Sequence, residues 1–365
     1  MARHNRPGLK DVANLAETSI ATASRVLSGK GYVAAETRAR VLAATQALNY
    51  HPNLRARGLR QRSSNSIGLI IPNLLNAYYT ALADAVSQLL AESGYHLLLS
   101  STRDDPAVEK DILHDMIGQD VDGLIWVPTT PGESLLNYLK SQHIPAVSIV
   151  RRVPGDALDT VVFGDFDGSY VATQHLIGLG HHSIGYIGGD TKHSSNHARW
   201  QGYLAAVRDA GLAPDESLVR LGAPRSTWGD VATIDLLRLP SPPTAIFVAS
   251  NAIMPGVIRT LRQYRVIVPD EMSLICFDDV DWFSFSVPPI TAISISHAKL
   301  AEAAVNLLLR RVEDPDEIEK PPIFMEIDFE LILRSSTGPP RRVPLVVRSN
   351  FANKMDPANA AVYRG

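Results

Sequence analysis

The spacing of apolar residues along the chain changes near Ser66. Before that point, single apolar residues recur at intervals of three and four, as in the stretch DVANLAETSIATASRVLSGKGYVAAETRARVLAATQALNYHPN that begins at Asp11. After it, short uninterrupted apolar runs alternate with stretches of helical spacing. The first pattern is typical of a small bundle of amphipathic helices, and the second of strands that alternate with helices.

The N-terminal stretch predicts two helices joined by a tight turn. The first helix has apolar positions at helical spacing, namely Leu9, Val12, Ala13, Leu15 and Ala16. Thr18 or Ser19 follows as the N-cap candidate of the second helix. At about 100° per residue, the second helix buries one face, which consists of Ala23, Val26 and Leu27. Its opposite face presents small side chains and one arginine, namely Ile20, Ala21, Ser24 and Arg25.

A third helix is expected from about 35 to 48, with Val41, Leu42 and Leu48 directed inward to complete a three-helix core. Two helices joined by a tight turn on such a core are typical of helix-turn-helix modules that bind DNA. Small residues on the presented face let the second helix lie close to the major groove, where Arg25 can donate two hydrogen bonds to a guanine edge. Thr22 flanks this face and can reach a phosphate.

Charge divides the chain at the same place. Residues 1–66 hold 11 Lys and Arg against three acidic residues, a net charge of +8, whereas the remainder holds 24 against 35, a net charge of -11. A basic head on an acidic body indicates that the head alone meets a polyanion. A solvated terminal extension is the simpler alternative.

Composition indicates a folded protein of the cytoplasm. Apolar residues make up 45% and charged residues 20% of the 365 residues, as in globular proteins. No apolar run approaches the roughly 18 residues that span a bilayer, and the N-terminus lacks the apolar core of a secretory signal. The single cysteine, Cys276, excludes an internal disulfide and fits a reducing compartment. We expect it in a buried strand, and we expect no membrane partner.

Eight short apolar runs lie beyond residue 65: SIGLII, YHLLLS, DGLIWV, PAVSIV, TVVF, SIGYIG, TAIFVA and SLICFD. Continuous apolar strands that alternate with helices are typical of parallel sheets covered on both faces, and eight of them predict two such sheets. The predicted fold class is therefore α/β: a three-helix head, then two lobes that are each built on a doubly wound parallel sheet. A ligand is expected beyond the carboxyl ends of the strands, in a cleft between the lobes.

The stretch LKDVANLAETSIATASRVLSG, followed by V…ETRARVLAATQALNYHPN, resembles the headpiece of the LacI/GalR family of bacterial repressors across the first 60 residues. The resemblance implies that the second helix enters the major groove of an operator. It implies DNA contacts for Ser19, Ile20, Ala21, Thr22, Ser24, Arg25 and Tyr32. Glu17 stands at a turn position where the family usually has glycine, so the turn needs a backbone conformation that a side chain tolerates.

The polar segment NYHPNLRARGLRQRSSNS is a basic linker with helical spacing from Asn53 to Leu59. In the family, the matching segment is a hinge helix that orders on the operator, lies in the minor groove and inserts a leucine between base pairs. The resemblance assigns that wedge to Leu59, with Ala56 beside it and Asn53 also at the DNA. Wedging costs unstacking energy, which contacts on the bent DNA offset. A flexible tether is the alternative.

Beyond the linker, the resemblance continues to about Leu333 through IGLIIPNLLNAYYTALADAV, DGLIWVP, HLIGLGHHSIGYIGG, RWQGYLAAV, PTAIFVASN and FDDVDWFSFSVPPITAI. The body of the family resembles periplasmic sugar-binding proteins. The resemblance implies effector contacts by Asn76, Tyr78, Tyr79, Asp165, His193, Ser195, Arg199, Ser250 and Asp278. The alternatives are lobe packing for the two tyrosines and a structural salt bridge between Arg199 and Asp278.

Three positions depart from the family pattern. Ser250 and Asn251 replace the usual pair of a small residue and aspartate, Val150 stands where an acid is common, and Ile295 stands where a polar residue is common. The pocket is therefore expected to hold fewer hydrogen-bond acceptors than a typical hexose site. The identity of the effector does not carry over from the family.

Three signals typical of enzymes were tested against the sequence. The glycines of GLGHHSIG lack the spacing of a dinucleotide-binding loop, so this stretch is read as a helix end and turn. His193 and His197 have no third metal ligand nearby, in a segment read as a loop. Asp278 and Asp279 have no nucleophile or general acid as partner. We expect no catalysis, no metal and no cofactor.

The sequence thus predicts a DNA-binding transcriptional regulator, most simply a repressor. It is expected to bind a palindromic operator as a homodimer, because a helix-turn-helix pair at matched spacing reads a palindrome. A small-molecule effector, a sugar or a related compound, is expected to control it. The alternative from another class is a cytoplasmic sugar-binding or sugar-metabolising protein whose head is vestigial.

The expected domain boundaries follow from these patterns. The head comprises 1–51, the hinge 52–65 and the effector-binding and dimerisation domain 66–337. Within that domain, lobe 1 is expected at about 66–165 and 297–324, and lobe 2 at about 166–296 and 325–337. The tail, 338–365, mixes Pro, Asn and Arg without periodicity and is expected to be disordered.

Overall fold

A computed structural model describes residues 7–28, 31–50, 64–129 and 133–345 of the chain. It divides into two compact units, Met1–Asn65 and Ser66–Gly365, which are described separately below. Among the described residues, no helix is long and apolar enough to cross a membrane.

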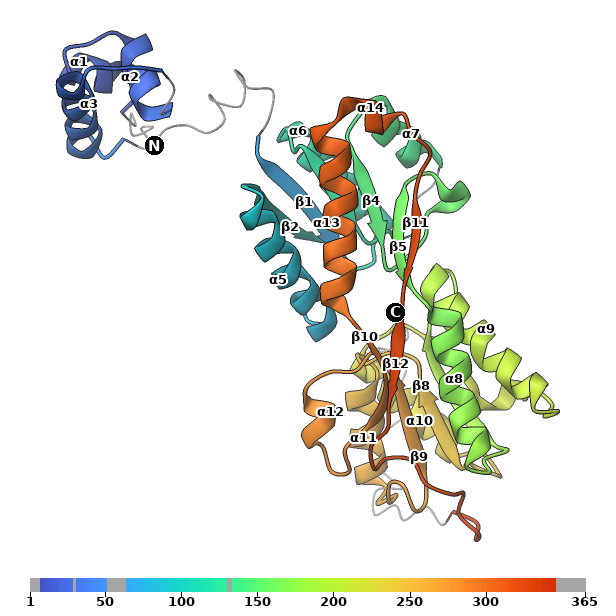
Figure 1. Cartoon of the computed structure of the whole chain (residues 1–365). Coiled ribbons are helices and arrows are strands. Elements are labelled where there is room, and N and C mark those ends of the chain that lie inside the picture. The colour runs from blue at the N-terminus through green and yellow to red at the C-terminus, as the bar shows by residue number, and fades with distance from the viewer. Residues whose placement is uncertain (1–6, 29–30, 51–63, 130–132, 346–365) are drawn as a thin grey trace. The chain divides into compact units, whose positions relative to one another are not determined.

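The described residues of the N-terminal unit form three helices (Figure 1). Its helices are α1 (Leu9–Leu15), α2 (Ile20–Ser28) and α3 (Ala35–Ala47). Small apolar side chains form a common core, which consists of Val12, Ala13, Ala16, Ala23, Val26, Val41 and Ala44. The predicted helices are confirmed, and so is the division of α2 into a buried face and a presented face.

One predicted core position of the head is wrong. Leu42 is 48% exposed, whereas Val41 and Ala44 are buried and Leu48 packs at the edge of the core. Positions 41, 44 and 48 share one face of a helix at three- and four-residue spacing, while residue 42 is turned about 100° away from it. Ala44, which a reading of large apolar residues passes over, takes the inward position.

The turn between α1 and α2 has the special conformation that the sequence suggested. Glu17 has a φ of 49°, in the left-handed region that favours glycine. Ser19 then caps α2, because its Oγ accepts a hydrogen bond from the backbone N–H of Thr22 at 3.0 Å. The cap starts the helix at Ile20 and thereby fixes which of its residues face outward.

The second unit consists of two lobes, each built on a six-stranded sheet (Figure 1). The strands of lobe 1 are β1 (Ser66–Ile71), β2 (His96–Ser101), β3 (Gly123–Trp126), β4 (Ala146–Ile149), β5 (Asp159–Phe163) and β11 (Phe324–Ile327). They lie in the order β11-β5-β4-β3-β1-β2, and all pairs are parallel. The helices are α5 (Ala77–Glu92), α6 (Pro106–Gly118), α7 (Glu133–Ser141), α13 (His297–Glu313) and α14 (Pro315–Ile318), with a short 3-10 turn at Pro154–Asp156.

Helices cover both faces of this sheet, as its apolar strands require. Alternate residues of β1 point to opposite faces: Ile67 and Leu69 pack in one core with α5 and α13, while Ile70 packs in the other with α6 and α7. The predicted doubly wound arrangement is therefore confirmed.

Lobe 2 repeats the architecture. Its strands are β6 (Ile184–Gly189), β7 (Val219–Gly222), β8 (Ala245–Val248), β9 (Ser273–Phe277), β10 (Thr291–Ile295) and β12 (Phe329–Ile332), in the order β12-β10-β9-β8-β6-β7. Only β12, at the edge, runs antiparallel to its neighbour. The helices are α8 (Asp165–Gly178), α9 (Ser194–Asp209), α10 (Ser226–Leu237), α11 (Met254–Gln263) and α12 (Trp282–Phe285), with a 3-10 turn at Glu216–Leu218. Cys276 is buried in β9, as predicted.

Four strands lack the continuous apolar run by which the others were found in the sequence. The residues of β7, β11 and β12 are mostly exposed or half-buried, because these strands lie at sheet edges. The fourth, β10, is buried but begins with Thr291 and has Ser294 between its apolar residues. Half-exposed edge strands accept charged residues, and their sequence signal is correspondingly weak.

The chain passes between the lobes three times, near Gly164, Ser296 and Asp328. The first two passages were expected after residues 165 and 296. The third was expected after residue 324, but β11 remains paired with β5 of lobe 1 as far as Ile327. In lobe 1, β1 lies between β2 and β3, and in lobe 2, β6 lies between β7 and β8. The strand order therefore reverses direction at β1 and at β6, and this switch point is where open α/β sheets bind ligands.

The expectation that the tail is disordered from Gly338 onward is wrong for its first part. His181 lies 2.8 Å from the carbonyl oxygen of Gly338, and Arg341 donates to the carbonyl oxygens of Pro243 and Glu271 at 2.8 and 2.9 Å. Side chains far apart in the sequence thus hold this segment against lobe 2. Residues 346–365 lie outside the described part of the chain.

Candidate functional site

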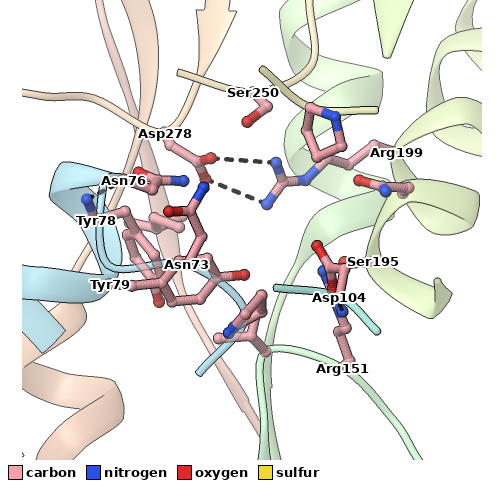
Figure 2. Close-up of a pocket in the computed structure, with 15 residues that line it drawn as sticks. Asn73, Asn76, Tyr78, Tyr79, Asp104, Arg151, Ser195, Arg199, Ser250 and Asp278 are labelled. Carbon is pink, nitrogen blue, oxygen red and sulfur yellow. Dashed lines mark hydrogen bonds and ion pairs between the residues drawn. The ribbon is translucent and has the colours of Figure 1, made fainter. Parts of the chain in front are cut away.

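A pocket lies between the two lobes, at the carboxyl ends of their strands (Figure 2). Its lining comes from loops and helix starts that follow six strands and from the ends of β4 and β10: Pro72, Asn73, Asn76, Tyr78, Tyr79, Asp104, Val150, Arg151, Ser195, Asn196, Arg199, Pro224, Ser250, Asp278 and Ile295. This is the location expected for a ligand of an open α/β sheet. The cavity measures about 60 Å³.

The turn from β1 into α5 places two aromatic side chains at the pocket. Asn76 is the N-cap of α5 and accepts a hydrogen bond from the backbone N–H of Tyr78 at 3.0 Å. The rings of Tyr78 and Tyr79 meet edge to face, with centroids 5.2 Å apart. Burial raises the pKa of Tyr79 to about 12 and that of Tyr78 well above its ordinary value, so both phenols are neutral.

The hydroxyl of Tyr78 is buried and has no hydrogen-bond partner among the described residues. Buried hydroxyls are almost always hydrogen-bonded in folded proteins, so the Tyr78 hydroxyl is an unsatisfied polar group in a residue that lines the cavity. The aromatic lining can also stack on a ring, so this wall of the pocket combines an apolar surface with one unsatisfied polar group.

Arg199 is the central charged group of the pocket. Its Nε donates to Asp165 at 2.7 Å, its two terminal nitrogens donate to Asp278 at 3.2 and 3.3 Å, and it also donates to the carbonyl oxygen of Ala249 at 2.7 Å. The guanidinium lies over the ring of Phe277, with its carbon 3.7 Å from the centroid. Arg199 therefore links α8, α9 and the ends of β8 and β9.

Close packing of α8 against α9 brings Asp165 and Arg199 together. A Cβ at Gly202 would lie 2.1 Å from the carbonyl oxygen of Phe166, so only glycine allows this approach. Burial raises the pKa of Asp165 to about 6, although the neighbouring Arg199 acts in the opposite direction. The salt bridge that we left open as an alternative for Arg199 and Asp278 is thus present, at the wall of the pocket.

A second ion pair comes from lobe 1. The Nη1 of Arg151 donates to Asp104 at 2.6 Å and to the carbonyl oxygen of Pro128 at 3.1 Å. Arg151 follows β4, and Asp104 lies in the loop after β2. Between β4 and Arg151, Val150 has a φ of 65°, which is strained for a β-branched residue. Neither Asp104 nor Arg151 was predicted from the sequence to be a site residue.

Two hydrogen bonds join the lobes beside the pocket. The Nδ1 of His193 lies 2.9 Å from the carbonyl oxygen of Thr129, and Ser194 Oγ accepts a hydrogen bond from the backbone N–H of Arg152 at 2.8 Å. A buried carboxylate, Glu109, holds Thr129 in place through bonds of 2.7 Å to its amide and hydroxyl. These bridging contacts connect lobe 1 to the start of α9.

The pocket brings together seven of the nine residues predicted for effector binding: Asn76, Tyr78, Tyr79, Ser195, Arg199, Ser250 and Asp278. Asp165 lies behind Arg199, and His193 bridges the lobes, so neither lines the cavity. The polar residues that sequence reasoning missed are Asn73, Asp104, Arg151 and Asn196. The loop position of Asn73 and Asp104, after β1 and β2, is the signal that could have identified them.

The predicted DNA-contacting face of the head is accessible. Ile20 is 47% and Tyr32 is 93% exposed, and Ala21 and Arg25 are also exposed. Thr22 and Ser24 are half-buried, and the Ser19 hydroxyl lies 2.9 Å from that of Thr22. Asn53, Ala56 and Leu59, which were predicted for the hinge, lie outside the described residues.

Within the described ranges, no group of three or more His, Cys, Asp or Glu side chains could hold a metal ion. The segment around His197 is not a loop, as the sequence suggested, but the first turn of α9. Its ring faces that of Trp200 at a centroid distance of 6.2 Å.

Two family models match the chain. Residues 8–53 match the model described as bacterial regulatory proteins, lacI family, and residues 173–337 match the model of a periplasmic binding protein-like domain. Similar proteins include the HTH-type transcriptional repressor PurR of Actinobacillus pleuropneumoniae, which is 34% identical over 90% of this chain and 97% of its own length. PurR of Haemophilus influenzae is 33% identical over 90% of this chain and 98% of its own.

Solved structures share the whole architecture. The lac repressor dimer bound to operator and the anti-inducer ONPF superposes with a TM-score of 0.78 at 25% identity, over 92% of this chain and 100% of that one. The complex of the transcriptional regulator CelR with cellobiose has a TM-score of 0.69 at 27% identity, over 91% and 100%. The head and the two-lobed body thus occur together in these proteins, in the same order along the chain.

Proposed function

Because the chain belongs to the LacI family of bacterial regulatory proteins, we propose that it represses transcription as a homodimer on a palindromic operator, under the control of a small polar effector. The observation that carries the proposal is the presence, in one chain, of a presented helix face on α2 and a pocket with an unpartnered hydroxyl between two lobes. The resemblance noted in the sequence is confirmed. Its relatives named above are repressors and regulators, not enzymes.

On the DNA side, α2 is the reading helix. Ile20, Ala21 and Arg25 are exposed, and we assign base contacts to them. Phosphate contacts are assigned to the hydroxyls of Ser19, Thr22 and Ser24, while Tyr32 lies exposed in the irregular segment before α3. The hinge role of Asn53, Ala56 and Leu59 stays a prediction from the sequence.

Exposed apolar side chains support a dimer. Leu99 on β2 and Val108 on α6 are 41% and 37% exposed in lobe 1, and Phe285 and Val287 are 72% and 82% exposed in lobe 2. In Figure 1, β2 and α12 lie on the same side of the body. A continuous interface along that side would cover apolar groups of both lobes, and pairing of two heads would match the symmetry of a palindrome.

We assign the effector to the pocket between the lobes and propose a sugar or a related ring compound. The aromatic pair Tyr78 and Tyr79 can stack on a ring, and Ser195 and Ser250 add hydroxyls to the same cavity. The CelR structure, at 27% identity, is described as a cellobiose complex. Val150 and Ile295 line the cavity as the sequence analysis foresaw, so part of the wall offers no hydrogen bond.

We propose a DNA-binding head at 1–51, a hinge at 52–65 and an effector-binding domain from 66 onward. The domain extends beyond residue 337 to include Arg341, because the side chain of Arg341 is bonded to lobe 2. Binding to an operator places the protein in the cytoplasm.

A gel shift with the DNA upstream of the protein's own coding region tests the proposal. We expect a retarded complex that scrambled DNA of the same length does not form. Thermal-shift screening with sugars, polyols and nucleosides then identifies the effector, because a ligand of the native state raises the melting temperature. A protein that binds a sugar in this screen and no upstream DNA would instead be a sugar-binding protein with a vestigial head.

A further inference from the structure

Carboxylates of the chain already neutralise both guanidinium groups of the pocket. We propose that the pocket excludes anionic molecules, that the effector is therefore uncharged, and that Asp104 is the residue that determines this exclusion at Arg151. The inference rests on the proposed function, because it names the chemical class of effector for the same site. Sugar phosphates, nucleotides and sugar acids would thereby be excluded.

The positive charge of Arg199 is already compensated by carboxylates of the chain. Two carboxylates, those of Asp165 and Asp278, bond to it at 2.7 to 3.3 Å, and a carbonyl oxygen takes a further N–H. All three charged side chains are at most 9% exposed, so water screens them little. With both carboxylates ionised, this cluster carries one net negative charge and repels an entering anion.

Arg151 is the only other cation of the described lining. Its Nη1 is bonded to Asp104 and Pro128, and no described contact occupies its Nε or Nη2. These nitrogens can donate to a ligand, while Asp104 balances the charge. The lining as a whole then holds two cations, Arg151 and Arg199, against two anions, Asp104 and Asp278.

An anion would be bound in this pocket only at a high cost, because a charge removed from water needs a countercharge to offset its lost hydration. An uncharged ring with hydroxyl or carbonyl groups needs none. It can bond to the side chains of Ser195 and Ser250, which line the cavity, and to the N–H groups of Arg151 that no described contact occupies. The polar groups of the pocket can therefore form hydrogen bonds to a ligand that brings no charge out of water.

Replacement of Asp104 by asparagine removes the negative charge of the side chain while keeping its size and shape. Asp104 has a φ of 58°, and asparagine tolerates this left-handed conformation better than most residues. The amide oxygen of the substituted side chain can still accept the hydrogen bond from Arg151. Asp104→Asn therefore keeps this hydrogen bond and removes one negative charge beside Arg151, at a position that also lies 3.9 Å from the Nε2 of His193.

The experiment measures the melting temperature of the full chain in inorganic phosphate against chloride at equal ionic strength. Asp190→Asn is the matched control, because Asp190 is a nearby half-buried carboxylate whose ion pair is with Lys192, at 3.7 Å. We expect phosphate to stabilise the wild type and Asp190→Asn equally. Asp104→Asn should gain about 3 °C more at a phosphate concentration roughly tenfold above its Kd. The double variant Asp104→Asn/Arg151→Met should lose this gain.

Three results would overturn the proposal: phosphate stabilisation of the wild type equal to that of Asp104→Asn, no gain in Asp104→Asn, or a gain that persists without Arg151. Phosphate bound by the basic head contributes equally to every variant and cancels. If Asp104→Asn does not fold, Asp104→Gly removes the same charge at a position where glycine is at ease. The assay contains no DNA, so failure of operator binding in the gel shift is a separate result.

Discussion

The buried carboxyl of Asp165 makes the stability of the body depend on pH. Burial raises its pKa in the folded protein to about 6, from an ordinary value of 3.8. In the pH range between these two values, the native state holds a proton that the unfolded state has released. Stability therefore falls as pH rises from about 4 to 6, and the penalty of the ionised form is fully present above that range.

A shift of about two pKa units corresponds to about 3 kcal/mol over the full range. The asparagine of Asp165→Asn has no ionisable group, so this pH dependence is absent from the variant. Asp278 still pairs with Arg199 there. We therefore expect the variant to be destabilised relative to the wild type more at pH 4.5 than at pH 7.5. Between these two pH values the difference should change by about 2 kcal/mol.

Urea unfolding followed by tryptophan fluorescence measures this change, because all four tryptophans of the chain lie in the body and none in the head. Asp167→Asn is the matched control, since Asp167 lies exposed on the same turn of α8. Parallel pH profiles for Asp165→Asn and the wild type would show that Asp165 is not the titrating group, and the argument from its burial would then be refuted.

Three further predictions concern the head and the pocket. Arg25→Ala should lower discrimination between operator and scrambled DNA by about 1 to 3 kcal/mol per half-site in fluorescence anisotropy, whereas unchanged discrimination would remove the base-reading role. Tyr78→Phe should leave the melting temperature unchanged or raise it, since the Tyr78 hydroxyl has no described partner. Tyr203→Phe should lower the free energy of unfolding by about 1 kcal/mol, because the variant loses a 2.9 Å hydrogen bond to the carbonyl oxygen of Ile184. Val41→Ala should destabilise the head by about 2 kcal/mol in amide hydrogen exchange. Leu42→Ala should stay within about 0.5 kcal/mol, and an equal effect of the two would contradict the observed exposure of Leu42.

Local pattern was sufficient for the parts of the fold that local physics determines. Strands such as β1 and β8 are continuous apolar runs because both faces of their sheets are covered. The turn at Glu17 was identified because a side chain stood where the resemblance implied glycine. By contrast, β11 and β12 are exposed edges, and their membership in different sheets depends on pairing with strands far away in the sequence.

The site shows the same division. Tyr78, Arg199 and Asp278 belong to recognisable stretches, and they do meet at the cavity. Arg151 and Asp104 are 47 residues apart and belong to loops without a pattern, so only the folded chain shows that they form a pair. His193 was assigned to the effector, but the close approach of the lobes turns its ring to Thr129 instead. Such contacts depend on tertiary geometry that periodicity does not encode.

The bridging contacts and the small cavity together link effector binding to the separation of the lobes. A cavity of about 60 Å³ is smaller than the roughly 150 Å³ that accommodate benzene, so a ring-sized effector must bind a wider cleft. Widening breaks the bonds of His193 and Ser194 across the cleft, each worth about 1 kcal/mol. Together they favour the narrow cleft by about 30-fold, which an effector that binds only the wider cleft offsets at a concentration about 30-fold above its Kd for that form. Because coupling free energies are reciprocal, an operator that prefers the narrow cleft must weaken effector binding by the same factor by which the effector weakens operator binding.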